Sequence, residues 1–281
     1  MSAQPAPRPT GGPGITRFAT RGGHRLSYES SGATDGIPLL GFHDLLADRG
    51  QLRLLGENLP HDRYRLTLPD ARGHGASPLI AGRAYPIHEL TADALAVLNA
   101  EGLRRVHIAA VGWGAGIALG LTLDAPERVA SLVLAQPYLP ALTGPEDSLE
   151  TLRQAADAAE RGQTDRALDL YLTMRLGADW REGMPKARLG ATRRAAGSLA
   201  PLLTGTIGAP FDSAALARIE TRLTLLLPDD APIVERGAVA RLGEQLAGSE
   251  VETVVVDDVN HPPGRDWTSA IAHAVLAQTG T

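Results

Sequence analysis

Cysteine is absent from this chain of 281 residues. That absence excludes disulfide bonds, thiolate metal sites and a cysteine nucleophile, and it fits a reducing compartment. Lysine is nearly absent too, because Lys186 is the only one and all other basic residues apart from histidine are arginines. No segment approaches the roughly 20 apolar residues that a membrane-spanning helix needs. The sequence therefore predicts a cytoplasmic protein that is not inserted in a membrane.

A large excess of charge of one sign is missing as well. The formal net charge is -5, and charged residues are mixed along the chain rather than gathered in blocks. This balance does not favour nucleic acid or an anionic membrane surface as a partner. We therefore expect a small-molecule substrate as the partner, and nothing in the sequence indicates an oligomeric state.

The order of apolar runs predicts an α/β protein with a mostly parallel central sheet flanked by helices. Residues 1–14 are rich in proline and glycine, which predicts a disordered tail rather than a secretory signal. Residues 141–210 contain helical patterns and no strand candidate, and we expect them to form a helical lid over the sheet edge. Residues 15–140 and 211–281 then form the core domain.

Individual elements can be expected from hydrophobic periodicity and from turn residues. Strands are expected at residues 15–20, 25–29, 38–42, 64–69, 106–111, 132–135, 223–227 and 251–256. In the core domain, helices are expected at residues 51–59, 88–101, 113–124, 236–247 and 266–278.

The most specific motif is a strand that runs into a glycine-rich turn and a helix. It reads Ala110-Val111-Gly112-Trp113-Gly114, and Pro126-Glu127-Arg128-Val129 follows the helix. It resembles the strand–elbow–helix unit of α/β-hydrolases, whose elbow has the pattern G-x-S-x-G. Trp113 after the nucleophile position is similar to the epoxide-hydrolase and haloalkane-dehalogenase branch, whose nucleophile is Asp. Here Gly112 stands at the nucleophile position.

Two other motifs agree with this resemblance. Residues 70–77 (DARGHGAS) resemble the family's D-x-R-G-H-G-x-S turn, to which we assign a structural role. Residues 40–45 (LGFHDL) are similar to its oxyanion loop, with Asp44 where the family has glycine. The resemblance covers nearly the whole chain from residue 15. It implies the α/β-hydrolase fold with the lid inserted after the sixth strand.

Two positions of the family's catalytic triad are vacated. Gly112 has no side chain, so no covalent intermediate can form there. This change is explained either by loss of function with relief of backbone strain or by a site cleared for substrate or water. The resemblance places the acid at Ala231. Asp230, one residue earlier, is a candidate substitute acid, although a solvated turn or a helix cap explains it too.

The third position of the triad is filled. His261 follows the last expected strand, where the resemblance places the catalytic histidine. An unperturbed imidazole titrates near ~6.5, which suits a general base. Asp230 or Asp258 could orient it. Asp44 is the second candidate catalytic residue, either as an acid or base or as a ligand for a cationic or hydroxylated group.

The substrate pocket is expected to combine the oxyanion loop, the elbow and the lid. The backbone N–H groups of Leu45 and Trp113 are expected to form an oxyanion-type pocket. No metal or cofactor is predicted, because the histidines lie in separate motifs without metal-ligand spacing. The candidate substrate-binding residues are His43, Leu45, Gly112, Trp113, Tyr138 and Trp180, with Tyr171 as a further pocket wall.

Three functions remain open. The one we favour from the sequence is a lyase, isomerase or cyclase that acts on a small apolar organic molecule of specialised metabolism without a covalent enzyme intermediate. The second is a non-catalytic ligand-binding protein. The third is a hydrolase that attacks an ester or epoxide with water activated by His261.

Overall fold

The computed structural model describes residues 14–80, 82–143, 148–208, 211–231, 233–256 and 267–280. Residues 1–13 of the expected tail lie outside this part of the chain, and so do Asp258 and His261. Within it, eight strands form one sheet in the order β1-β2-β4-β3-β5-β6-β7-β8. The strands are β1 (Ile15–Arg21), β2 (His24–Gly32), β3 (Ile37–Phe42), β4 (Tyr64–Pro69), β5 (Val106–Val111), β6 (Val129–Ala135), β7 (Arg222–Pro228) and β8 (Val251–Val256).

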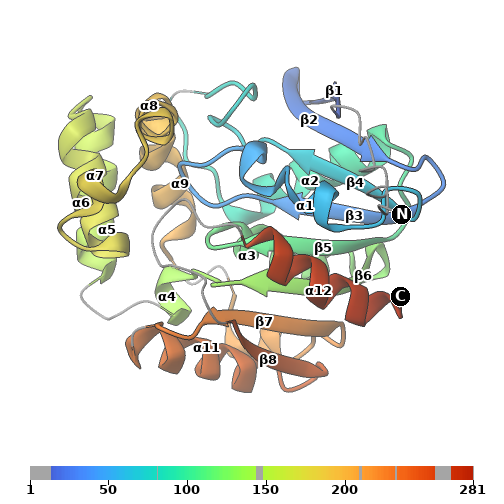
Figure 1. Ribbon diagram of the computed structural model, residues 1–281. Coiled ribbons are helices and arrows are strands. Elements are labelled where there is room, and N and C mark those ends of the chain that lie inside the picture. The colour runs from blue at the N-terminus through green and yellow to red at the C-terminus, as the bar shows by residue number, and fades with distance from the viewer. Residues whose placement is uncertain are drawn as a thin grey trace, which may run out of the picture.

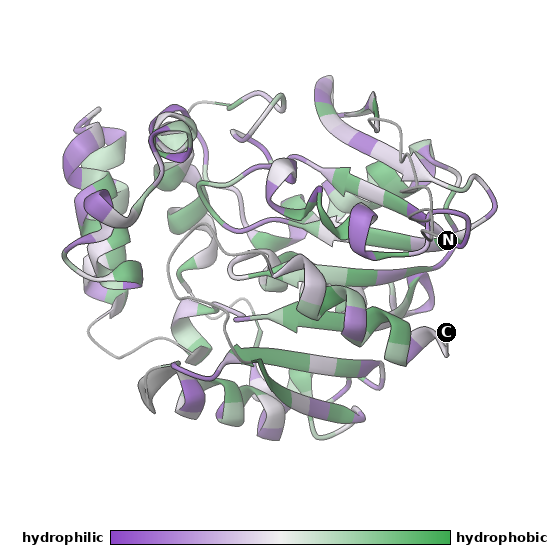
Figure 2. Cartoon of the chain, viewed as in Figure 1, coloured by the Kyte–Doolittle hydropathy of each residue, from purple (hydrophilic) through white to green (hydrophobic). Residues whose placement is uncertain are grey.

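The sheet is antiparallel only at its first edge. β1 pairs with β2 and β2 with β4 in antiparallel fashion, whereas all pairs from β4 to β8 are parallel. Parallel strands are buried on both faces and therefore read as continuous apolar runs. Figure 2 shows this hydrophobic character along the central strands β5, β6 and β7. The expected mostly parallel sheet is confirmed.

Helices cover both faces of the sheet (Figure 1). Buried residues of α1 and α12 belong to one hydrophobic core, and most buried apolar residues of α2, α3 and α11 belong to another. In α2, Leu90, Ala94 and Leu98 are buried, whereas Leu95 is partly buried. The helices of the core domain are α1 (Leu55–Asn58), α2 (Ile87–Ala100), α3 (Gly114–Asp124), α10 (Ser213–Leu216), α11 (Ile233–Gln245) and α12 (Thr268–Thr279).

A group of helices is inserted between β6 and β7, and Figure 1 shows it gathered at one edge of the sheet. It touches the core at the loops that follow the strands: the Tyr85 N–H donates to the Pro201 carbonyl at 2.8 Å. The lid role of this segment remains a prediction. These inserted helices are α4 (Pro140–Thr143), α5 (Ser148–Glu160), α6 (Thr164–Leu176), α7 (Trp180–Gly183), α8 (Lys186–Ala195) and α9 (Leu199–Thr206).

One expected helix was wrong. Residues 51–59 do not form a single helix but a 3-10 turn, Arg49–Leu52, followed by the short α1. The Asp48 side chain accepts a hydrogen bond from the Gly50 N–H at 2.8 Å and so starts the turn two residues earlier than expected. Leu52 and Leu55 are both buried, so the apolar spacing that suggested one helix comes from two short pieces packed on the same core.

Candidate functional site

A tight turn at Gly112 joins β5 to α3. Its φ of +54° lies in the left-handed region, where a residue with a side chain is strained. The Gly112 N–H donates to the Ala135 carbonyl at 3.0 Å, and its carbonyl accepts from the Tyr138 N–H at 2.9 Å. The turn therefore ties together the carboxyl ends of β5 and β6, the edge at which open α/β sheets place their sites.

A carboxylate fills the space in front of this turn. Asp44 lies two residues beyond the end of β3. A Cβ atom at Gly112 would lie 2.3 Å from Asp44 Cγ and Oδ1 and 2.5 Å from Oδ2. Such distances are far inside van der Waals contact. A side chain at position 112 and Asp44 in its present position therefore exclude each other.

The Asp44 carboxylate also occupies the expected oxyanion-type pocket. Its Oδ1 accepts hydrogen bonds from the Trp113 N–H at 2.7 Å and from the Leu45 N–H at 2.8 Å. Hydrogen bonds to an ionised group contribute about 1.5–3 kcal/mol each. The two backbone donors thus fix one oxygen of Asp44 and leave Oδ2 on the other side of the carboxyl group.

Two inserted helices bring cations and a hydroxyl to this carboxylate. At the end of α6, Arg175 Nη2 lies 3.7 Å from Asp44 Oδ2, and its guanidinium stacks on the Tyr138 ring at 3.8 Å. Burial, and then the Asp44 charge, raise the pKa of Tyr171 well above its usual value, so this hydroxyl is protonated. Burial lowers the pKa of Arg188 in α8, while the charge of Asp44 opposes that shift.

Sequence reasoning missed Arg175 and Arg188. Both lie among the many arginines of the inserted segment, and no local pattern separates them from the solvated ones. Their relation to Asp44 appears only in the tertiary structure, where Arg175 lies 3.7 Å from it and Arg188 is influenced by its charge.

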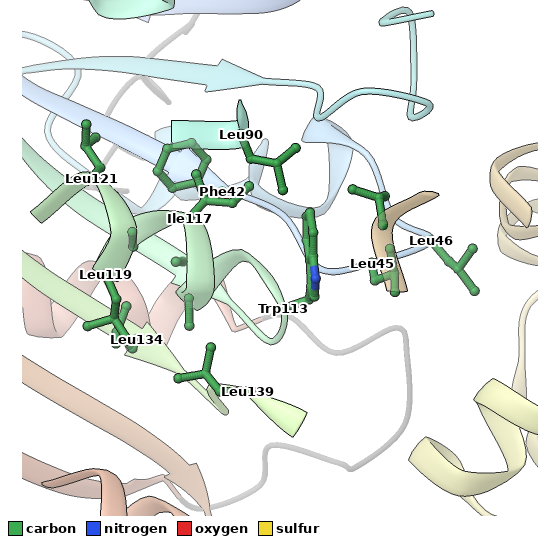
Figure 3. Close-up of a cluster of buried hydrophobic side chains, with 14 of the residues drawn as sticks. Phe42, Leu45, Leu46, Leu90, Trp113, Ile117, Leu119, Leu121, Leu134 and Leu139 are labelled. Atoms are coloured by element: carbon green, nitrogen blue, oxygen red, sulfur yellow. The ribbon is translucent and has the colours of Figure 1, made fainter. Parts of the chain in front are cut away.

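The indole of Trp113 packs inside the core (Figure 3), near Leu45 of the oxyanion loop. Its Nε1–H donates to Thr206 Oγ1 in α9 at 3.2 Å. Tyr138 is buried, and its hydroxyl donates to Met174 Sδ at 3.8 Å. The structure therefore brings Leu45, Trp113 and Tyr138 together at the elbow. Their contact with a substrate remains a prediction.

His43 is held by the backbone through both nitrogens of its ring, and its expected contact with a substrate stays a prediction. Its Nδ1 donates to the Asp44 carbonyl at 2.8 Å, and its Nε2 accepts from the Ala71 N–H at 3.0 Å. The ring is buried. Since the backbone binds both ring nitrogens, His43 braces the oxyanion loop.

His74, in the expected structural turn, braces the same loop in neutral form. Its Nε2 accepts from the Leu46 N–H at 3.1 Å, and its Nδ1 donates to the Arg72 carbonyl at 3.0 Å. Burial, and then the neighbouring His43, lower the pKa of His74 to about 3. In the unfolded chain an imidazole titrates near ~6.5. Between these values only the unfolded state gains the proton, so this group lowers stability as the pH falls.

In the variant His74→Gln, the free energy of unfolding is therefore expected to fall less steeply as the pH decreases from about 6.5 to about 4. The slope should be smaller by the equivalent of about one bound proton. Urea unfolding at a series of pH values measures this slope. His88 is exposed, and His88→Gln should keep the slope of the original protein. An unchanged slope in His74→Gln would show that another group causes the loss of stability in acid.

The remaining predicted residues lie around β7 and in the inserted helices. Ala231 is buried, and its carbonyl accepts from Arg236 Nε at 2.8 Å, whereas Asp230 is exposed. The pairing of Asp230 or Asp258 with His261 stays a prediction, because Asp258 and His261 lie outside the described residues. Trp180 is buried at the start of α7, and its role as a pocket wall stays a prediction too.

Over the described ranges, no group of three or more histidine and acidic side chains is arranged to hold a metal ion. None of the helices described above combines the length and hydrophobicity needed to cross a bilayer.

Part of the chain matches a known protein family in sequence. The family described as the alpha/beta hydrolase fold matches residues 38–169. The putative carbamate hydrolase RutD of Variovorax paradoxus (strain S110) is 32% identical over 113 residues, which are 40% of this chain and 42% of that protein. The 2-hydroxymuconate semialdehyde hydrolase of Pseudomonas sp. (strain CF600) is 33% identical over 129 residues, 45% of this chain and 44% of that protein. The matches thus span less than half of these relatives.

Solved structures are similar over nearly the whole chain. A thermophilic esterase from Thermogutta terrifontis has a TM-score of 0.76 and 20% identity, with 95% of this chain and 98% of that chain covered. The enol-lactonase from Burkholderia xenovorans LB400 has a TM-score of 0.71 and 17% identity, with 94% and 100% covered. At such identities the similarity concerns the fold alone.

Proposed function

Because the chain is an α/β-hydrolase-fold protein, we propose that it hydrolyses a small organic molecule by means of the Asp44 carboxylate and His261, without an elbow nucleophile. One observation carries this proposal: Asp44 Oδ1 is held by the Trp113 and Leu45 N–H groups, in front of Gly112. The matched curated relatives bear the names of hydrolases, which supports hydrolysis over the lyase, isomerase or cyclase reaction favoured from the sequence.

The filled pocket favours an epoxide over an ester as the substrate. Hydrolysis of an ester develops a negative charge on the carbonyl oxygen, which needs the N–H donors of an oxyanion pocket. In this site that oxygen would compete with Asp44 for the same two donors and would be repelled by its charge. Opening of an epoxide develops charge on the ring oxygen instead, and the protonated Tyr171 is a hydroxyl donor on the side of the inserted helices.

The test compares the hydrolysis of a panel of aryl epoxides with that of aryl esters. The products are separated by chromatography and identified by mass spectrometry. We expect diols from the epoxides and little acid from the esters. In Asp44→Asn and in His261→Ala, kcat/KM should fall at least about 1,000-fold, the size of a lost acid–base or nucleophilic group. Asp48→Asn is the matched control, since Asp48 lies in the same loop and caps the 3-10 turn; its activity should remain close to that of the original protein.

Other products would point to the other functions. A product that gains no water would indicate a lyase, isomerase or cyclase, and binding without turnover would indicate a ligand-binding protein. Efficient ester hydrolysis that persists in Asp44→Asn would also contradict the proposal, because it would need the pocket that Asp44 fills.

A further inference from the structure

A second candidate binding site lies at the edge of the sheet away from the inserted helices, where the parallel strands begin (Figure 1). A hollow with a volume of about 620 Å³ opens there. We propose that this hollow binds a small multivalent oxyanion, such as a phosphate group, through the guanidinium groups of Arg104, Arg105 and Arg128. Such a site is separate from the elbow and does not depend on the proposed reaction. The remaining lining residues are Asn99, Gly102, Leu103 and Glu127.

The pairing of two strands brings these arginines together. Arg105 directly precedes β5, and Arg128 directly precedes β6. In the parallel register, Val106 at the start of β5 pairs with Val129 at the start of β6. Neighbouring strands lie about 4.8 Å apart, and Arg104 comes just before Arg105. Three cationic side chains thus start from one short stretch of the sheet edge, where they repel one another unless an anion lies between them.

Two of the arginines are held in place by the backbone of the neighbouring segment. Arg128 Nε donates to the Arg104 carbonyl at 2.7 Å, and its Nη2 donates to the Leu103 carbonyl at 2.8 Å. In the other direction, Arg105 Nε donates to the Val129 carbonyl at 3.4 Å. A guanidinium group has five N–H donors, so both side chains keep donors for a ligand. A guanidinium that is already fixed loses little conformational freedom when it binds an oxyanion through two hydrogen bonds.

The charge of the three arginines is not neutralised by the described part of the chain. No carboxylate in that part forms an ion pair with Arg104, Arg105 or Arg128, although Glu127 lines the same hollow. The hollow therefore has a formal charge of +2, on a chain whose net charge is -5. The effect reaches the interior of the sheet: burial, and then the positive charge of Arg105, lower the pKa of His107 in β5. This excess of positive charge favours an anion as the ligand.

The shape and the surroundings of the hollow favour a small anion over nucleic acid. Concave sites of roughly 300–1,000 Å³ are the usual size for small ligands. Nucleic acid is bound along an extended basic stripe, whereas the net charge of -5 on this chain repels a long polyanion. A tetrahedral oxyanion with at least two negative charges can accept hydrogen bonds from several guanidinium groups at once.

Calorimetric titration with inorganic pyrophosphate, at an ionic strength held constant with sodium chloride, tests the site. We expect saturable binding, and a Kd raised at least about 10-fold in Arg104→Gln, the effect of one lost charged hydrogen bond. The Arg104 side chain forms no hydrogen bond or ion pair with the described residues, so this variant should stay folded. Arg153→Gln removes an exposed arginine of α5 and is the matched control, with an unchanged Kd. Binding that does not saturate, or an unchanged Kd in Arg104→Gln, would overturn the inference.

Three further arms locate and identify the anion. Arg175→Gln should leave the Kd unchanged, and loss of binding in this variant would place the anion beside Asp44 and overturn the inference. A short DNA duplex should bind more weakly than pyrophosphate, and tighter binding of the duplex would overturn the choice of a small anion. A lower Kd for phenyl phosphate than for inorganic phosphate would assign a phosphate ester as the ligand, and a higher Kd would assign free phosphate.

The imidazole of His107 gives a readout that needs no variant. Because the charge of Arg105 lowers the pKa of His107, an anion bound to Arg105 should raise it. Nuclear magnetic resonance measures this pKa in sodium sulfate and in sodium chloride of equal ionic strength, since sulfate keeps its charge over the range in which imidazole titrates. The same pKa in both salts, beside saturable pyrophosphate binding, would place the anion away from Arg105 and overturn the inference.

Discussion

Replacement of Gly112 by alanine is expected to lower the free energy of unfolding by at least about 4 kcal/mol. The added Cβ would lie 2.3 Å from the Asp44 carboxylate. The carboxylate must then leave the Trp113 and Leu45 N–H groups, and alanine also bears the strain of a positive φ, about 1–2 kcal/mol. Urea unfolding of the variant beside the original protein measures the loss.

Two comparisons separate strain from collision. Gly102 has a φ of +68° and open space around its Cβ position, so Gly102→Ala should cost only the backbone term of about 1–2 kcal/mol. In an Asp44→Gly background, Gly112→Ala should cost about as much as Gly102→Ala, because nothing remains to collide with. An equal loss of stability in both backgrounds would contradict the mutual exclusion of Asp44 and a side chain at position 112.

Removal of the buried guanidinium of Arg72 should destabilise the protein by about 3–5 kcal/mol, the cost of breaking a buried ion pair. Arg72 Nε donates to Asp93 Oδ2, and Nη2 donates to Oδ1 at 2.7 Å. The hydrogen bond with Asp93 raises the pKa of Arg72 against the effect of burial. The variant Arg72→Met would fill most of the space but leave Asp93 short of a partner. Denaturant unfolding at neutral pH measures the loss.

Arg21 offers a matched control for Arg72. It contacts the same Asp93 at 3.1 Å, but its side chain is 30% exposed. Exposed ion pairs contribute about 0–1 kcal/mol, so Arg21→Met should cost less than about 1 kcal/mol. Equal losses in Arg21→Met and Arg72→Met would show that burial does not set the strength of this network.

Most of the fold could be predicted from the sequence, because parallel strands that are buried on both faces leave apolar runs of strand length. Residues 64–69 and 106–111 form strands with the predicted bounds, and the strand predicted at 132–135 begins earlier, at Val129. The 3-10 turn that contains Leu52 and the short helix α1 that begins at Leu55 were harder to predict from the sequence. Their burial reflects contact with distant residues, and periodicity cannot separate one helix from two short turns.

The sequence by itself determined that a glycine stands at the elbow and that an aspartate stands in the oxyanion loop. From the sequence alone these residues are two separate departures from the family pattern, because the sequence does not show how distant strands pair. The tertiary structure pairs Phe42 in β3 with Ala110 in β5, and Asp44 and Gly112 each follow two residues later. Parallel pairing therefore sets the carboxylate against the glycine. Only that packing, with α6 folded back to place Arg175 at 3.7 Å from Asp44, decided that the vacated elbow is filled.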